Sequence, residues 1–196
     1  MAKAHNWVQY TLDLPMGNEP GNVFNYNSGA TLILGHIFRL ATGTDIEEYA
    51  VEHLFTPLGI DDYYWDRTPY GLTDTQEGLY ISARSLAKIA QLFLQKGRWQ
   101  DEQVIPATWV EESTAPRYPT GKSDEEAYGY LWWSQPYTFK GKTVRAHFGK
   151  GFGGQRPIFL PDLNMVIVLT GWNILPGQPF LHAMKAVERV TAAVVD

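Results

Sequence analysis

The stretch Gln155-Arg156-Pro157-Ile158-Phe159-Leu160, followed by Pro161-Asp162-Leu163-Asn164 and by Met165-Val166-Ile167-Val168-Leu169, decides the fold class. Residues Gln155 to Leu160 and Met165 to Trp172 predict two strands. The Pro-Asp-Leu-Asn segment between them consists of turn residues and predicts a hairpin. Because Val166 to Leu169 is continuously apolar, we expect both faces of this strand to be covered.

Two earlier segments extend this hairpin into an antiparallel meander. Tyr128 to Ser134 and Thr143 to Phe148 both have the composition of strands. After the meander, Phe180 to Val195 has apolar residues at helical spacing, and we expect this helix to cover one face of the sheet.

The first half of the chain predicts helices instead. Leu32, Leu34, Ile37, Phe38 and Leu40 predict one apolar helix face, with Ser28 as the expected N-cap and Gly43 at the end. Further helices are expected after Asp45, over Ser82 to Gln95 and over Pro106 to Ser113, whereas Asp61 to Asp74 is expected to be a surface loop. Helices followed by an antiparallel sheet and a covering helix make an α+β class, and we expect one domain over residues 1–196.

Composition excludes several classes of function. The 196 residues include 44% hydrophobic residues, which indicates a folded chain, and 16 Lys and Arg against 21 Asp and Glu, which argues against a nucleic-acid-binding protein. No apolar run is long enough for a membrane span, and no signal peptide is evident. With no cysteine, the chain has neither disulfides nor a thiol nucleophile, and its histidines show no metal-ligand spacing, so no metal or cofactor is expected. The compartment stays open.

Five segments, taken in order, resemble the serine β-lactamase-related superfamily, which includes class C β-lactamases, penicillin-binding carboxypeptidases and related esterases and amide hydrolases. The segments lie over about residues 6–195 and are Phe24-Asn25-Tyr26-Asn27-Ser28-Gly29, Phe55-Thr56-Pro57-Leu58-Gly59-Ile60, the helix from Ser82 with Gly97-Arg98-Trp99, Tyr128-Gly129-Tyr130-Leu131-Trp132-Trp133, and Gly149-Lys150-Gly151-Phe152-Gly153-Gly154-Gln155.

The resemblance implies a nucleophile that this chain does not supply in the family's order. The family uses a Ser-x-x-Lys motif that precedes a Tyr-x-Asn loop. Here 25 residues precede Tyr26 and none is serine, so the chain resembles the C-terminal portion of such a protein. The one Ser-x-x-Lys, Ser85 to Lys88, follows the loop and lies in a predicted helix. We interpret it as two residues of an exposed helical face without a catalytic role.

The resemblance also assigns site residues. Tyr26 takes the place of the general base or proton shuttle, and Asn27 and Ser28 take the places of substrate contacts, although Ser28 serves equally well as a helix N-cap. Lys150, in the middle of Gly149-Lys150-Gly151, is one candidate for the cation that binds a substrate carboxylate.

A second alignment of the same motif stays open. His147, in His147-Phe148-Gly149, is the other candidate cation, since some esterase-like members carry histidine there. If the Lys150 alignment holds, the backbone N–H of Phe152 is the expected oxyanion donor, and Gly151 permits a close approach of substrate to the backbone.

Three hypotheses for the function follow from this resemblance. The first is part of a serine hydrolase for an ester, amide or β-lactam, inactive alone and completed by a second polypeptide that carries the nucleophile. The second is a binding module that retains the cleft without catalysis. The third is a self-sufficient hydrolase in which Tyr26 activates Ser28. For the first two, we expect either a complementing N-terminal half or self-association through uncovered apolar surface or a free sheet edge.

Overall fold

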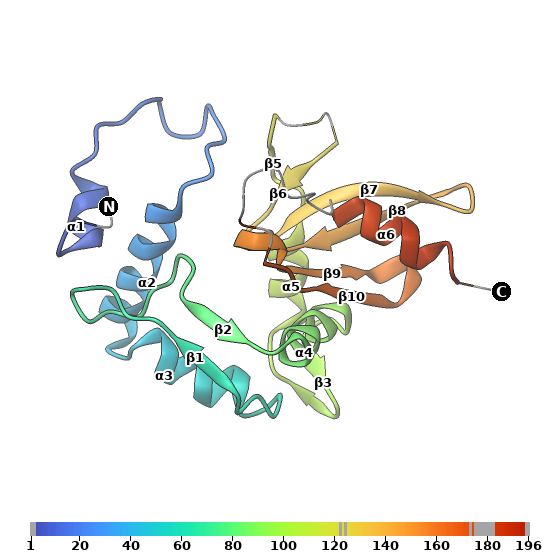
Figure 1. Ribbon diagram of the computed structural model, residues 1–196, viewed down its shortest axis with the longest axis horizontal. Coiled ribbons are helices and arrows are strands. Elements are labelled where there is room, and N and C mark those ends of the chain that lie inside the picture. The colour runs from blue at the N-terminus through green and yellow to red at the C-terminus, as the bar shows by residue number, and fades with distance from the viewer. Residues whose placement is uncertain (1–2, 122, 124, 173, 175–182, 195–196) are drawn as a thin grey trace. The chain divides into compact units, whose positions relative to one another are not determined.

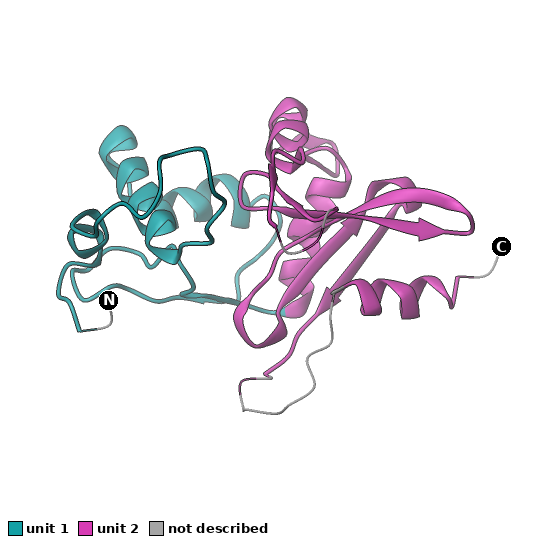
Figure 2. Cartoon of the chain, turned by 90° about the horizontal axis from the view of Figure 1, so that it is seen from above, with its two compact units in different colours: residues 1–82 teal, residues 83–196 magenta. Residues whose placement is uncertain are grey.

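The computed structural model describes residues 3–121, 123, 125–172, 174 and 183–194 (Figure 1). The chain divides into two compact units, residues 1–82 and 83–196, which Figure 2 shows in different colours. Each unit is described by itself below. The expectation of a single domain stays a prediction.

The helices of the first unit begin at capping residues. In α1 (Trp7–Leu12), the Asn6 side chain accepts a hydrogen bond from the Gln9 N–H, at 3.0 Å. α2 (Ser28–Thr42) ends at Gly43, as expected, but its N-cap is Asn27, whose side chain accepts from the Gly29 N–H at 2.8 Å. The assignment of Ser28 as the N-cap was therefore wrong. Asn27 has the extended backbone of a cap, and Ser28 is the first helical residue.

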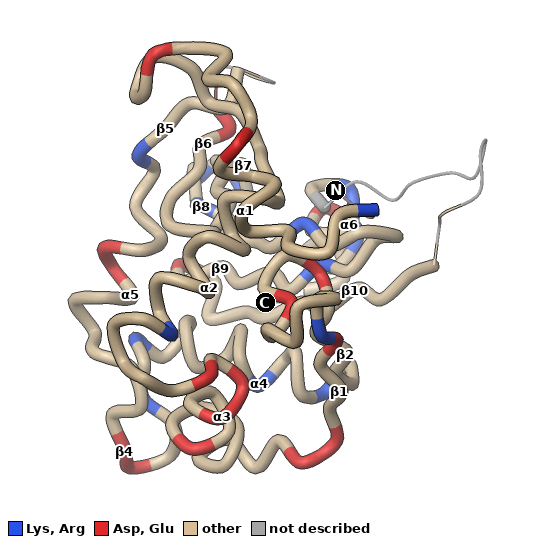
Figure 3. The backbone as a smooth tube through the Cα atoms, turned by 90° about the vertical axis from the view of Figure 1, so that its left-hand side faces the viewer, with Lys and Arg blue, Asp and Glu red and all other residues tan. Residues whose placement is uncertain are grey.

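Asp45 caps the next helix, as the sequence predicts. Its side chain accepts a hydrogen bond from the Glu47 N–H at 3.0 Å, and α3 (Ile46–Ala50) runs directly into the π-helical segment η1 (Val51–Phe55). Figure 3 shows acidic residues gathered around α3, where Glu47 and Glu48 lie in the first turn and favour the positive end of the helix dipole.

The segment expected to be a surface loop is partly a hairpin. β1 (Tyr63–Trp65) pairs antiparallel with β2 (Leu79–Ile81), and Arg67 bridges to Thr73. The expectation of an irregular loop over the whole segment was wrong. Aromatic residues at its start support a short strand. Polar residues further along it are buried and form local hydrogen bonds. Asp74 is one of these buried residues, and its backbone oxygen accepts from the indole N–H of Trp65 at 2.7 Å.

α2 does not bury the single apolar face that its leucines predict. Leu32 is 3% exposed, but Leu34, Ile37 and Leu40 are 53%, 52% and 73% exposed. Successive helical residues are turned by about 100°, so Leu32 lies on a different side of the helix from Leu34 and Ile37. The helix is thus apolar on two sides, of which one is covered.

The second unit is built on an antiparallel sheet of six strands in the order β10-β9-β8-β7-β6-β5, so each strand pairs with its neighbour in sequence. The strands are β5 (Tyr118–Pro119), β6 (Ala127–Tyr128), β7 (Trp133–Phe139), β8 (Lys142–Phe148), β9 (Arg156–Leu160) and β10 (Met165–Leu169). The predicted hairpin is confirmed: its turn is a 3₁₀ segment, η3 (Pro161–Leu163), followed by Asn164 in the left-handed conformation at φ 46°.

One predicted strand is two strands. Tyr128 closes β6 and pairs with Trp133 at the start of β7, while the Gly129 N–H donates to the Trp132 carbonyl at 2.8 Å. Leu131, between them, has a positive φ of 66°. The expectation of one continuous strand from Tyr128 to Ser134 was wrong because the chain turns back on itself at these residues.

Helices cover both faces of this sheet. α4 (Ala83–Leu94) lies on one face, where the ring centroids of Phe93 and Phe159 are 6.0 Å apart. α6 (Ala183–Thr191) lies on the other face, in front of the strands in Figure 1, and Thr191 shares a 2.7 Å hydrogen bond with the hydroxyl of Tyr137 on β7. This confirms a covering helix at the end of the chain, within the expected range. Residues 180–182 and 195 of that range lie outside the described residues.

The remaining elements are short. α5 (Ala107–Thr114) confirms the helix expected after Pro106. β3 (Arg98–Trp99) and β4 (Glu102–Gln103) form a small separate hairpin. None of the described helices combines the length and apolar character that crossing a bilayer requires.

Candidate active site

The glycine-rich segment between β8 and β9 forms a tight, well-bonded loop. The Gly149 N–H donates to the Pro157 carbonyl at 3.0 Å, and the Gly151 N–H donates to the Gln155 carbonyl at 2.9 Å. Arg156 stabilises the loop, because its Nη1 donates to the Gly151 carbonyl at 2.9 Å and to the Gln155 carbonyl at 3.0 Å. Burial lowers the pKa of the Arg156 guanidinium from its ordinary value.

The tip of this loop is a single 3₁₀ turn, η2 (Phe152–Gly154). Gly153 has a φ of 74°, a conformation that a residue with a Cβ adopts only with strain. Phe152 is 75% exposed and is the first residue of the turn, where backbone N–H groups have no acceptor within the turn itself. The role of its N–H as an oxyanion donor stays a prediction, as does the contact of Gly151 with substrate.

Lys150 has partners within its own unit. Its ammonium forms an ion pair with Glu126 Oε2, and it lies 3.6 Å from the centroid of the Trp133 ring. The Glu126 side chain is only 5% exposed, and its other oxygen accepts from the Thr120 hydroxyl at 2.9 Å. A buried carboxylate thus neutralises the first cation that the sequence suggested.

Nothing in the sequence pattern points to Glu126 as that partner. The residue closes a polar segment expected to be a loop, and 24 positions separate it from Lys150. Only the pairing of β5 with β6 and of β6 with β7 brings the acidic residue to the sheet.

His147, the second candidate cation, is a buried strand residue. It is 9% exposed on β8, its ring stacks on Phe159 at 4.9 Å between centroids, and its Nδ1 has no hydrogen-bond partner among the described residues. Burial, and secondarily the positive charge of Arg145, lowers the pKa of His147 to about 4. At neutral pH the imidazole is therefore uncharged.

Tyr26, Asn27 and Ser28 stand together at the N-terminus of α2 in the first unit. Tyr26 is 52% exposed, and Ser28 is exposed as well. The Asn27 side chain is already engaged by the Gly29 N–H as the helix cap. Their roles toward a substrate stay predictions, and so does their meeting with the loop of the second unit.

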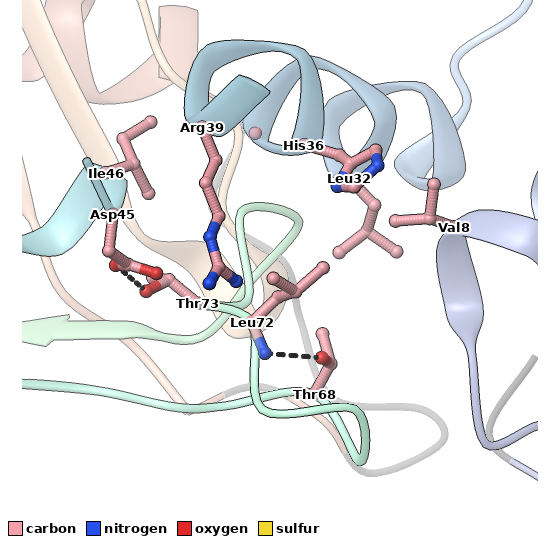
Figure 4. Close-up of a pocket in the computed structure, with 10 residues that line it drawn as sticks. Val8, Leu32, His36, Arg39, Asp45, Ile46, Thr68, Leu72 and Thr73 are labelled. Atoms are coloured by element: carbon pink, nitrogen blue, oxygen red, sulfur yellow. Dashed lines mark hydrogen bonds between the residues drawn. The ribbon is translucent and has the colours of Figure 1, made fainter. Parts of the chain in front are cut away.

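A small cavity of about 10 Å³ in the first unit lies between α2, α3 and residues 68–73 (Figure 4). Asp45 is its anchor, because it accepts hydrogen bonds from Thr73 and Glu47 and pairs with Arg67 at 3.2 Å. These bonds lower the pKa of Asp45 against the opposing effect of its partial burial, which is the largest single influence and raises it. These contacts of Asp45 thus hold the start of α3 to residues 67–73, and we assign the cavity beside them a structural role.

The Ser85-x-x-Lys88 motif lies inside α4, as expected, but not on an exposed face. Ser85 is buried at 6% exposure, and Lys88 is half-buried. The expectation of an exposed face was wrong because α4 lies against β9 and β10, so this part of the helix is covered. A nucleophilic serine needs to be reached by substrate, and burial argues against Ser85 in that role.

A family model described as "Beta-lactamase" matches residues 1–184. The chain belongs to the beta-lactamase family. No match is found among curated proteins.

Solved structures show the same fold. A candidate 6-aminohexanoate-dimer hydrolase from Bacillus anthracis matches 91% of this chain with a TM-score of 0.75 and 26% identity, and the match covers 45% of that chain. A penicillin binding protein from Bacillus halodurans matches 94% of this chain with a TM-score of 0.67 and 17% identity, over 62% of its own length. The octameric penicillin-binding protein homologue from Pyrococcus abyssi matches 89% of this chain with a TM-score of 0.69 and 22% identity, and the match covers 44% of that chain.

The beta-lactamase-family chain described here thus spans about half the length of these structures. The matches confirm the resemblance and the partial α+β fold of that family, and they support a hydrolase-related fold for the chain.

Proposed function

We propose that this chain is the part of a serine hydrolase that supplies the tyrosine loop and the glycine-rich strand end, and that it does not hydrolyse esters, amides or β-lactams by itself. The observation that carries the proposal is the position of its one Ser-x-x-Lys. That motif lies within α4, and its serine is buried. The family's chemistry needs an accessible serine with an amine beside it.

The chemistry of this family explains what each part would contribute. The nucleophilic hydroxyl attacks the acyl carbon while a base takes its proton, and the leaving group departs with a proton as the acyl-enzyme forms. A tyrosine such as Tyr26 moves that proton only where a neighbouring cation stabilises its phenolate. Backbone N–H groups in the loop containing Phe152 would bind the oxyanion. The nucleophile and its amine would come from outside the residues of this sequence.

Charge at the strand end favours uncharged acyl compounds as the substrate class. The ammonium of Lys150 is paired with Glu126, and His147 is neutral at neutral pH. A substrate carboxylate would therefore meet no uncompensated cation from these two residues. Esters and neutral amides fit this charge state better than β-lactams that carry a carboxylate.

The test is covalent labelling of the purified chain. Incubation with a fluorophosphonate and, separately, with a penicillin is expected to leave the intact mass unchanged, because the serine of the one Ser-x-x-Lys motif is buried. A stoichiometric adduct would contradict the proposal. Ser28→Ala and Ser85→Ala variants then identify the serine, and loss of the adduct in Ser28→Ala alone would favour the self-sufficient hydrolase.

The second candidate is a binding module without catalysis, and the same neutralised strand end favours it. If the chain binds a neutral ester with no turnover, even when co-expressed with the remaining half of the Bacillus anthracis neighbour, this alternative gains support over the first.

A further inference from the structure

The side chain of Gln155 continues the pairing of β9 with β10 past the last backbone pair. At this end of the two strands, Arg156 lies opposite Leu169. Next to that pair, Gln155 Nε2 donates to the Gly171 carbonyl, and Gln155 Oε1 accepts from the Gly171 N–H at 3.3 Å. A primary amide carries a donor and an acceptor side by side, so one side chain bonds to both backbone groups of a single residue. Gln155 thus ties the chain after β10 to the start of β9.

The backbone of the same residue closes the glycine-rich loop. The Gly151 N–H donates to the Gln155 carbonyl at 2.9 Å, and Arg156 Nη1 donates to that carbonyl at 3.0 Å. A Cβ on Gly151 would lie 2.7 Å from Gln155 Cβ, so a larger residue at position 151 would displace Gln155. Gln155 therefore holds the loop through its backbone and the chain after β10 through its side chain.

The tip of the loop packs against the residue that Gln155 holds. A Cβ on Gly153 would lie 3.2 Å from the Gly171 carbonyl oxygen and 3.7 Å from Gln155 Nε2. Gly153 is buried and has a φ of 74°, so the turn Phe152–Gly154 has little room to move on this side. The contacts form a closed ring, which runs from the Gln155 backbone through Gly151 and the turn to Gly171, and back through the Gln155 side chain.

We propose that Gln155 is a positioning residue, whose side-chain amide fixes the turn Phe152–Gly154 by holding Gly171 against Gly153. The same contacts fix the direction of the Phe152 N–H. Backbone donors stabilise a developing negative charge best when they are already oriented, because no reorganisation is then needed during the reaction. This consequence for catalysis rests on the proposed function, whereas the effect of Gln155 on the turn does not.

The first test compares two glutamines of the second unit whose side chains bond to backbone. Gln155→Met keeps a side chain of similar length and removes its donor and its acceptor. Gln103→Met is the matched control, because Gln103 Nε2 donates to the Lys96 carbonyl at 2.9 Å and to the Ile105 carbonyl at 2.5 Å, both outside the loop. Two-dimensional ¹H–¹⁵N NMR of the chain follows the backbone amides of the turn and of Gly171, together with their hydrogen exchange.

The expected changes are confined to one variant. Gln155→Met should shift the amide signals of Phe152 and Gly154 and speed exchange of the Gly171 N–H about tenfold or more, since two hydrogen bonds are lost. Gln103→Met should leave these signals unchanged. Unchanged turn signals in Gln155→Met, or equal changes in both variants, overturn the proposal. If Gln155→Met does not fold, as far-UV circular dichroism would show, Gln155→Glu decides, because it loses only the donor and should still shift the turn signals.

A second measurement separates this proposal from the proposed function. Dimethyl phosphate is a tetrahedral anion that resembles the charged intermediate of acyl transfer, and its binding is followed at the Phe152 amide. We expect that amide to shift with concentration in the unaltered chain, with binding about fivefold weaker or more in Gln155→Met. Equal binding to both chains overturns the positioning of the Phe152 N–H. No shift in the unaltered chain contradicts the oxyanion role in the proposed function, and the exchange rates then decide the role of Gln155.

Discussion

His147 makes stability depend on pH in a way that its surroundings predict. Its pKa is lowered from 6.5 to about 4 in the folded chain, chiefly by burial. Between these two values the unfolded chain binds a proton that the folded chain does not. Stability is therefore fully present above about pH 6.5 and is lost as the pH falls toward 4. At 1.36 kcal/mol per pKa unit, the loss is about 2 kcal/mol at pH 5 and about 3 kcal/mol in total.

The assay compares the chain with His147→Phe, which keeps an aromatic ring beside Phe159 and cannot be protonated. Urea denaturation followed by tryptophan fluorescence, at pH 7 and pH 5, gives the free energy of unfolding for both chains. Carboxyl groups titrate equally in both, so the difference between their pH responses isolates the histidine. We expect the variant to lose about 2 kcal/mol less on going to pH 5. Equal losses, or an imidazole NMR titration near 6.5, would refute the reasoning.

Three other substitutions test the contacts described above. Glu126→Gln leaves the Lys150 ammonium without its carboxylate and is expected to cost about 3 kcal/mol in thermal denaturation, with partial recovery when Lys150→Met is added. Gly97→Ala would place a Cβ 1.9 Å from a backbone carbonyl at a φ of 81°, so we expect it to destabilise by well over the roughly 1 kcal/mol of Gly43→Ala, which meets no atom within 4 Å. Asp45→Ala removes a helix cap and an ion pair, and chemical denaturation should show a loss of about 1–2 kcal/mol.

The sequence predicts the order of elements well where local chemistry decides them. The helix after Asp45, the helix Ala83–Leu94 that ends shortly before Gly97, and the hairpin turn at Pro161 are all found where caps and turn residues place them. Errors arise where two neighbouring residues suit the same structural role. Asn27 and Ser28 are both good caps, and only backbone conformation separates the cap from the first helical residue.

The chemistry of the strand end was less predictable than its position. A motif can align Lys150 or His147 with a cation site, but it carries no information about what surrounds either side chain. Glu126, which is distant in sequence, neutralises Lys150, and burial against Phe159 keeps His147 uncharged at neutral pH. Both effects depend on tertiary contacts, which sequence spacing does not specify.

Apolar patterning indicates that a surface is covered, without saying by which polypeptide. Leu34 and Ile37 on α2 stay half exposed, and no strand of the described residues lies beyond β10, although both segments have the composition of buried elements. The two features lie in different units, so one contact need not explain both. Structures that share this fold have chains roughly twice as long. Exposed apolar residues on α2 are therefore consistent with a surface that a further polypeptide covers.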